Sequence, residues 1–414
     1  MPLFDDFERT YSGPAQTAEP VFEYLNRSAR SEFGQVRDRL EAWLARYPRV
    51  GKPDLRSRLR SRKDRAFYAA FWELYTHECL RALGYTLTAH PIIPGTSTTP
   101  DFLADKYGVS FYVECRLAWE ETAEEERRRN RLSVVYDALQ GKLDSPNFLL
   151  WVDAHCVGSA PIKTDPLVKH LADWLRPLDP ETVHEVFRES GSRREALPST
   201  EWETDGWRLT FCALPKPRQA RDKKGRRALG VFSEGGGRWS NGTRRILQVL
   251  KEKGGKYESL DRPYVIALLC QGHFAEELDL VQALLGSEAA AIGSNAYGAM
   301  TVRPLRTPDG FWYRSAGPQY TRVSAVIGCF NLHPWNINEK TPLLVHNPWP
   351  SDALDPSALP WRSLVPNHEA GELQELAASV NLQSLLELPD AWPFLEGRDS
   401  AGSGHVPHDP CDPA

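Results

Sequence analysis

The sequence lacks the patterns that mark several common classes of protein. Its seven cysteines are scattered and include no Cys-x-x-Cys pair, so neither a zinc ribbon nor a disulfide scaffold is expected. It contains no His-Glu-x-x-His motif, which leaves a zinc hydrolase without support. A Gly-x-Ser-x-Gly nucleophile motif and a Walker A phosphate-binding loop are absent as well.

Long apolar segments are also missing. The longest clean apolar runs, such as residues 264–270, are far too short to span a bilayer. The first residues have neither the basic region nor the apolar region of a signal peptide. The sequence therefore predicts a cytoplasmic protein with no membrane partner.

Positive charge is not in excess over the whole chain. Lys and Arg total 50 against 55 Asp and Glu, a formal net charge of −5, so any contact with nucleic acid must come from a local basic patch. Residues 27–65 form one such patch and include the basic run 56–65. The loop 216–227 forms another and includes the cations Arg218, Lys223, Lys224 and Arg227. Both patches are consistent with phosphate contacts and also with an ordinary solvated surface.

Composition and length indicate a folded protein of several parts. Hydrophobic residues make up 41% and charged residues 25% of the 414 residues, as in average globular proteins, and this length allows two or three domains. We divide the chain into a basic N-terminal helical segment (1–62), an α/β core (63–155), an α+β region (156–350) and a Pro-rich segment that ends in a disordered tail (351–414).

Residues 63–155 carry the clearest pattern of secondary structure. Apolar residues at helical spacing predict a long helix over about 63–83, ended by Gly84. A short strand at 85–90 should follow. Two more strands, beginning at Pro100 and at Val109, should pair across a turn at 106–108. A charged helix over about 120–140 and an apolar strand at 147–155 complete the order α-β-β-β-α-β.

Acidic residues are placed on this core so that they can meet. Asp101 opens one strand, while Glu114 and Arg116 point to the same face of the next strand because strand side chains alternate. Glu73 lies on the preceding helix, where Glu78 is a competitor. Clustered carboxylates suit Mg²⁺ or Mn²⁺, which prefer oxygen ligands, whereas without a cation they would repel one another. In the alternative interpretation, Asp101 caps a turn after Pro100, and Glu114 pairs with Arg116 or with a helix arginine at a sheet edge.

Pro100-Asp101, followed by Glu114-Cys115-Arg116 on the next strand, resembles the motif of the PD-(D/E)xK nuclease superfamily. The resemblance covers about 90 residues and implies a restriction-endonuclease-like αβββαβ core, a divalent metal and hydrolysis of phosphodiester bonds. It implies Asp101 and Glu114 as metal ligands and Glu73 as a third ligand or water-positioning group. The sequence departs from the motif at Arg116, where the family usually has Lys.

The predicted function is therefore a Mg²⁺- or Mn²⁺-dependent nuclease acting on DNA or RNA, whose core is followed by a larger C-terminal α+β elaboration. Arg116 stays charged and cannot act as a general base, but it can stabilise the charge that develops on the scissile phosphate. The alternative is a catalytically degenerate module on the same fold that binds nucleic acid or a partner protein. Arg in place of Lys favours the alternative, and the retained carboxylates oppose it.

Overall fold

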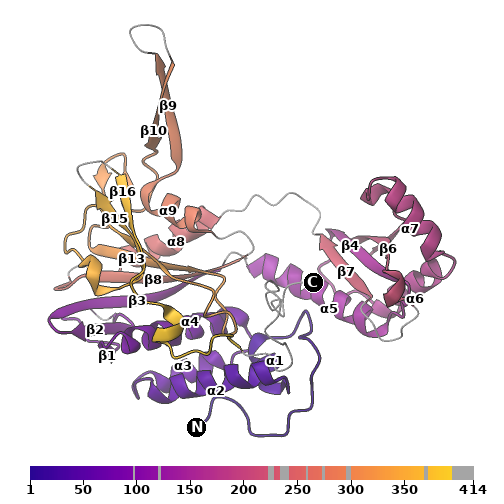
Figure 1. Ribbon diagram of the computed structural model, residues 1–414, viewed down its shortest axis with the longest axis horizontal. Coiled ribbons are helices and arrows are strands. Elements are labelled where there is room, and N and C mark those ends of the chain that lie inside the picture. Colours follow the sequence, from indigo (N-terminus) through magenta and orange to yellow (C-terminus); the bar gives the residue numbers. More distant parts are fainter. Residues whose placement is uncertain are drawn as a thin grey trace. The chain divides into compact units, whose positions relative to one another are not determined.

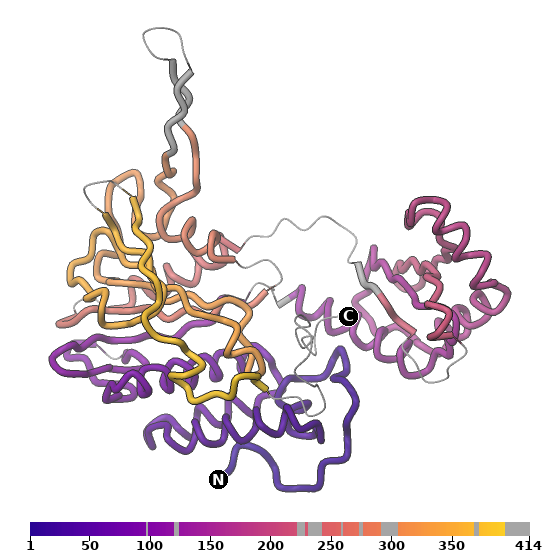
Figure 2. Tube along the Cα trace, viewed as in Figure 1, coloured from indigo at the N-terminus to yellow at the C-terminus, as the bar shows by residue number. Residues whose placement is uncertain are grey.

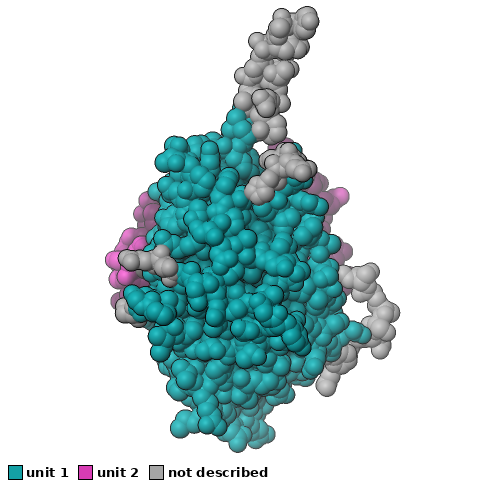
Figure 3. Space-filling model, turned by 90° about the vertical axis from the view of Figure 1, so that its left-hand side faces the viewer, with its two compact units in different colours: residues 1–12, 20–120, 240–399 teal, residues 13–19, 121–239, 400–414 magenta. Residues whose placement is uncertain are grey.

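The computed structural model describes residues 1–96, 98–119, 123–221, 228–233, 242–257, 260–272, 276–294, 300–367 and 372–393 (Figure 1). The chain forms two compact units, coloured separately in Figure 3. Unit 1 comprises residues 1–12, 20–120 and 240–399, and unit 2 comprises 13–19, 121–239 and 400–414. Residues 121–239, the main part of unit 2, are thus inserted into the sequence of unit 1.

Unit 1 is built on a mixed sheet of eight strands in the order β1-β2-β3-β8-β13-β14-β15-β16. β1, β2 and β3 form an antiparallel meander, β3, β8 and β13 run parallel to one another, and β14 is antiparallel to β13. The strands are Thr86–Ala89, Phe102–Lys106, Val109–Trp119, Tyr264–Gln271, Val323–Phe330, Leu343–His346, Arg362–Asn367 and Glu372–Leu376. The protein is therefore a mixed α/β protein, as the sequence predicted.

The first half of the predicted core is confirmed. Helix α4 (Asp64–Ala82) ends just before Gly84, whose φ of +89° is a left-handed conformation that favours glycine at a helix end. The turn between β2 and β3 likewise uses positive φ at Tyr107 and Gly108. Thirteen residues of α4 are buried, which explains why its sequence is apolar almost all round rather than along one stripe.

The second half of the predicted core lies elsewhere. Helix α5 (Ala123–Lys142) and strand β4 (Phe148–Cys156) form as predicted, but both belong to unit 2, and β4 pairs with β6 and β7 in a separate sheet. The strand that lies beside β3 is β8, in register from Tyr112 opposite Tyr264 to Trp119 opposite Gln271. Figure 2 shows these two segments side by side although unit 2 separates them in sequence.

Helices cover both faces of the unit 1 sheet around β3. Tyr112 and Ala118 of β3 share a hydrophobic cluster with Ile246 and Leu250 of helix α8 (Gly242–Gly254) and with helix α9 (Glu277–Leu285). The alternate residues of β3, such as Cys115, face α4. The side chain of Trp72 in α4 donates a hydrogen bond to the Ala267 carbonyl of β8 at 2.9 Å, which fixes the helix to the sheet.

The remaining described elements of unit 1 extend this core. The N-terminal helices α1, α2 and α3 span Val21–Arg27, Ser31–Arg46 and Lys52–Leu59. Short hairpins are formed by β9 (Glu288–Ser294) with β10 (Met300–Arg306) and by β11 (Tyr313–Arg314) with β12 (Gly317–Pro318), and α10 spans Leu382–Leu385. None of the described helices is long and apolar enough to cross a membrane.

Unit 2 is a smaller α/β unit with its own core. Its sheet has the order β5-β6-β4-β7, in which β5, β6 and β7 span Ser199–Thr204, Trp207–Pro215 and Leu229–Ser233. Apolar side chains of α5, of α6 (Thr164–Leu175) and of α7 (Pro180–Glu189) pack against one face of this sheet. Asp137 of α5 accepts hydrogen bonds from the backbone of Thr17 and Ala18, which joins residues 13–19 to this unit.

These units differ from the four segments drawn from the sequence. The basic N-terminal segment 1–62 packs within unit 1 apart from residues 13–19, and the core 63–155 is divided between the two units. The region 156–350 is divided as well. Strands β15 and β16 of the Pro-rich segment 351–414 belong to the eight-stranded sheet, and the proposed tail lies outside the described residues. Composition marks local breaks in the chain, whereas strand pairing across an insertion decides which segments share a core.

Candidate active site

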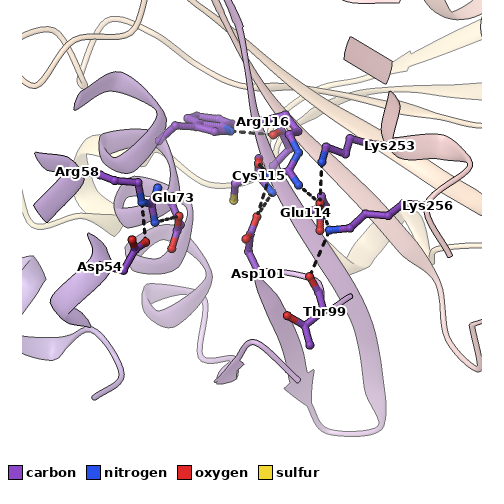
Figure 4. A network of polar contacts seen from close by, with 12 residues as sticks. Asp54, Arg58, Glu73, Thr99, Asp101, Glu114, Cys115, Arg116, Lys253 and Lys256 are labelled. Atoms are coloured by element: carbon purple, nitrogen blue, oxygen red, sulfur yellow. Dashed lines mark hydrogen bonds and ion pairs between the residues drawn. The ribbon is translucent and has the colours of Figure 1, made fainter. Parts of the chain in front are cut away.

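Strand pairing brings Asp101 and Glu114 to one end of the meander. Phe102 opposes Val113, so Asp101, immediately before β2, lies beside Glu114 and Cys115 of β3. The carboxylate oxygen Oδ2 of Asp101 accepts a hydrogen bond of 2.6 Å from the backbone amide of Cys115 (Figure 4). The predicted approach of the two acidic residues is thus present.

Glu114 is fully buried on the α8 side of the sheet and is surrounded by donors. Its Oε1 forms an ion pair with Arg116 and another, of 2.9 Å, with Nζ of Lys256, while Nζ of Lys253 lies 3.9 Å away. Its Oε2 accepts a hydrogen bond of 2.9 Å from the hydroxyl of Tyr257. A buried carboxylate requires such partners, because isolated burial of the charge would be prohibitive.

Arg116 contacts both acidic residues. One guanidinium nitrogen pairs with Glu114, and the other donates to the Cys115 carbonyl at 2.7 Å and lies 3.8 Å from Oδ2 of Asp101. Its Nε is buried and has no hydrogen-bond partner in the described part of the chain. The pairing of Glu114 with Arg116 is the geometry that the alternative interpretation of the sequence required.

Asp101 is an acidic residue whose ionisation the site perturbs. Burial raises the pKa of the Asp101 carboxyl to about 7, and the neighbouring charges of Glu114 and Glu73 add to the rise. Arg116 and the amide of Cys115 oppose it. The contacts of the carboxylate with the Cys115 amide and with Arg116 are both made through Oδ2. The Asp101 carboxylate is therefore short of positive charge, which is a condition that a bound cation would relieve.

Glu73 does not join the other two carboxylates. It lies on α4, on the opposite side of the sheet from Glu114, and Figure 4 shows it directed to Arg58. Its oxygens accept hydrogen bonds of 2.5 Å from the Tyr47 hydroxyl and 2.7 Å from Arg58. Glu73 influences the pKa of Asp101 at a distance, but both of its oxygens are occupied. The helix carboxylate thus lies beneath the sheet and not above the predicted pair.

The residues at this site fit a divalent cation only in part. No group of three His, Cys, Asp or Glu side chains in the described ranges is arranged to hold a metal ion. Mg²⁺, however, is commonly bound through one or two carboxylates together with water and substrate phosphates. Asp101 and Glu114 would be those carboxylates. Glu114 would then have to lose part of its contact with the surrounding cations.

Three important residues of the site were missed in the sequence. Lys253, Lys256 and Tyr257 lie at the end of α8 and just beyond it, about 140 residues after Glu114 and on the far side of unit 2 in sequence. The only signal was a helix with two lysines followed by Gly254 and Gly255. Such a pattern is common, and only the pairing of β8 with β3 brings this helix over Glu114.

The predicted nucleic-acid-binding residues are described only in part. Arg218 pairs with Glu181 of α7 at 2.7 Å, and Arg221 pairs with the same carboxylate. Lys223, Lys224 and Arg227 lie outside the described residues. In the run 56–65, the arginines at 56, 58, 60 and 62 contact acidic side chains or backbone carbonyls of unit 1. Arg218 and these four arginines therefore also serve the fold.

Comparison with known proteins identifies no relative of this chain. No family model matches the sequence, and no curated protein and no solved structure is similar to it. Function is therefore inferred from the geometry of the site.

Proposed function

We propose that this protein is a divalent-metal-dependent phosphodiester hydrolase that acts on DNA or RNA. The observation that carries the proposal is the convergence of Asp101, Glu114 and Arg116 where β2 and β3 pair. Two carboxylates supply oxygen ligands for a cation, and the cations around them supply positive charge for a phosphate.

The topology gives independent support. Helix α4, the meander β1-β2-β3, helix α8 and the parallel strand β8 together form the order α-β-β-β-α-β around the site. This is the order expected of a restriction-endonuclease-like core once unit 2 is treated as an insertion after β3. In this proposal Asp101, Glu114 and Arg116 take the roles of the motif residues, with α8 and β8 in place of α5 and β4.

Each residue has a distinct proposed role. Asp101 and Glu114 hold the divalent cation, which when bound would polarise the phosphate and lower the pKa of a bound water. Arg116 stabilises negative charge on the phosphate, and its fixed place on a central strand means that little reorganisation is needed. Glu73, on the α4 side, adds negative charge near Asp101, which raises the pKa of that carboxyl and would attract a cation to the site.

A second function is favoured by one specific observation. Glu114 is already neutralised by Arg116 and Lys256, so this carboxylate needs no metal ion to balance its charge. A non-catalytic module that binds nucleic acid or a partner protein needs no metal ion, so these ion pairs of Glu114 would be sufficient for it.

Cleavage assays separate the two functions. Purified protein is incubated with plasmid, single-stranded DNA and RNA, with Mg²⁺, with Mn²⁺ and with a chelator. We expect metal-dependent cleavage that falls by about 10²- to 10⁴-fold in Asp101→Asn, since loss of a ligand costs several kcal/mol of transition-state stabilisation. Asp173→Asn, which removes an exposed carboxylate paired with Arg176, is the matched control and should retain full activity. Binding without cleavage on every substrate would favour the non-catalytic module.

A further inference from the structure

More positive charge surrounds Glu114 than one carboxylate needs. Arg116, Lys253 and Lys256 all place a nitrogen within 4.0 Å of the same oxygen, Oε1. The cations therefore repel one another while they share Glu114. At least one of them would be stabilised by a second anion.

Lys256 is the cation best able to move. Arg116 lies on β3, between β2 and β8, and is fixed by the sheet. Lys256 instead follows the end of α8, after Gly254 and the exposed Gly255. Its other contacts are weak, namely the Thr99 carbonyl at 3.5 Å and the face of the Tyr257 ring at 5.1 Å. The ammonium of a lysine sits on a flexible four-carbon chain, so it can change partners without any movement of the backbone.

We propose that Lys256 is an exchangeable partner of Glu114. It neutralises Glu114 in the protein alone, and it transfers to a phosphate of the nucleic acid when a divalent cation binds Asp101 and Glu114. This inference deepens the proposed function, on which its nucleic acid and its divalent cation rest. It assigns to Lys256 a positioning role that the sequence did not indicate.

The exchange couples the binding of metal to the binding of nucleic acid. In the protein alone, a divalent cation must compete with Lys256 for Glu114, so its affinity is reduced. A polyanion offers Lys256 another partner and removes that competition. Because coupling between two binding sites is reciprocal, the metal ion must strengthen the binding of the polyanion by the same factor.

The test measures the affinity for Mn²⁺ by titration calorimetry and by paramagnetic resonance, with no cleavage required. Lys256→Met removes the charge and keeps the length of the side chain. We expect it to raise the Mn²⁺ affinity of the protein alone by about tenfold, which corresponds to about 1.4 kcal/mol. Lys256→Arg should lower that affinity, because a guanidinium binds a carboxylate with two hydrogen bonds. Lys251→Met changes an exposed lysine of the same helix, and we expect no effect from this control.

A short single-stranded DNA oligonucleotide then tests the coupling. It should increase the Mn²⁺ affinity of the wild-type protein but not that of Lys256→Met. The inference is overturned if Lys256→Met leaves Mn²⁺ affinity unchanged or lowers it. It is also overturned if neither wild type nor Lys256→Met binds Mn²⁺, since removal of the competitor should reveal the site.

The outcome can be distinguished from failure of the proposed function. Altered Mn²⁺ affinity without cleavage of any substrate would sustain the exchange and reject the hydrolase. Metal-dependent cleavage with unaltered Mn²⁺ affinity in both Lys256 variants would sustain the hydrolase and reject the exchange.

Discussion

Buried carboxyl groups on the two sides of the unit 1 sheet have pKa values shifted in opposite directions. On the α4 side, Glu78 is fully buried and contacts Arg46, Arg81 and His77. Burial by itself would raise the pKa of Glu78, but the hydrogen bonds from His77 and Arg46 outweigh it and the pKa is lowered. On the α8 side, the pKa of Asp101 is raised. The contacts of Glu78 stabilise the charged form of its carboxyl group. The surroundings of Asp101 destabilise the charged form of its carboxyl group.

The kind of cation differs as well. The α4 side uses arginines, and Arg46 donates to Glu78 through two nitrogens. The α8 side adds two lysines from a helix end to the arginine on β3. Planar guanidinium groups hold a carboxylate in one geometry, whereas lysine ammonium groups change partners easily. The α4 side is therefore suited to fixing the helices in place, and the α8 side is suited to binding ligands.

Among the changes that test this comparison of the two sides, the largest effect on activity is expected at Arg116. Arg116→Ala should reduce cleavage by about 10²- to 10³-fold, or about 2–4 kcal/mol of transition-state stabilisation, because it removes a preorganised charge. Arg116→Lys should keep or increase activity, since it retains the charge and supplies the residue usual in the motif that this sequence resembles. Single-turnover rates at saturating Mg²⁺ measure both variants. Full activity in Arg116→Ala would reduce Arg116 to a structural partner of Glu114 and would make the two sides of the sheet alike.

The next largest effect concerns stability on the α4 side. Glu78→Gln should lower the free energy of unfolding by about 2–4 kcal/mol, somewhat less than for a fully buried pair, because Arg46 and Arg81 are 39% and 45% exposed and can be partly solvated. Its Mn²⁺ affinity should not change. Denaturant titration measures the loss, with Glu23→Gln as the control for a solvated pair with Arg62, which should cost less than about 1 kcal/mol. A change in Mn²⁺ affinity in Glu78→Gln would show that the two sides are not independent.

The comparison also predicts a dependence on pH at Asp101. Since the pKa of Asp101 is about 7 in the folded protein, its carboxyl group is protonated below that pH and cannot bind a cation. Mn²⁺ affinity should therefore rise by about tenfold per pH unit up to about pH 7 and then level off, because the ionised fraction rises tenfold per unit.

The same shift has a consequence for stability with the opposite sign. The folded-state pKa of Asp101 lies above the model value of 3.8, so the folded protein loses stability as pH rises through this interval. Asp101→Asn should remove this loss and stabilise the protein near pH 8, by up to about 1.4 kcal/mol for each unit by which the pKa is raised, but not near pH 4. Thermal unfolding of both proteins across that range measures it. A constant difference between them would mean that Asp101 titrates as an ordinary exposed carboxyl.

Local chemistry let the sequence predict the elements around the site. The apolar pattern and Gly84 defined α4, and the short turn at 106–108 defined the pairing of β2 with β3. Alternation along β3 placed Glu114 and Arg116 together and turned Cys115 to the other face. All of these follow from contacts between residues that are close in sequence.

Tertiary structure decided the rest. A helix and strand after β3 matched the expected order, yet α5 and β4 pack in unit 2, and α8 and β8 complete the sheet of unit 1. Glu73 lies across the sheet from Glu114, while Lys253 and Lys256 reach Glu114 from beyond the insertion. The alternation of apolar residues in the sequence indicates that a strand has a buried face. It does not report which sheet supplies the partner strand, because many apolar strands satisfy the same hydrogen bonds and only the packing of the whole chain selects among them.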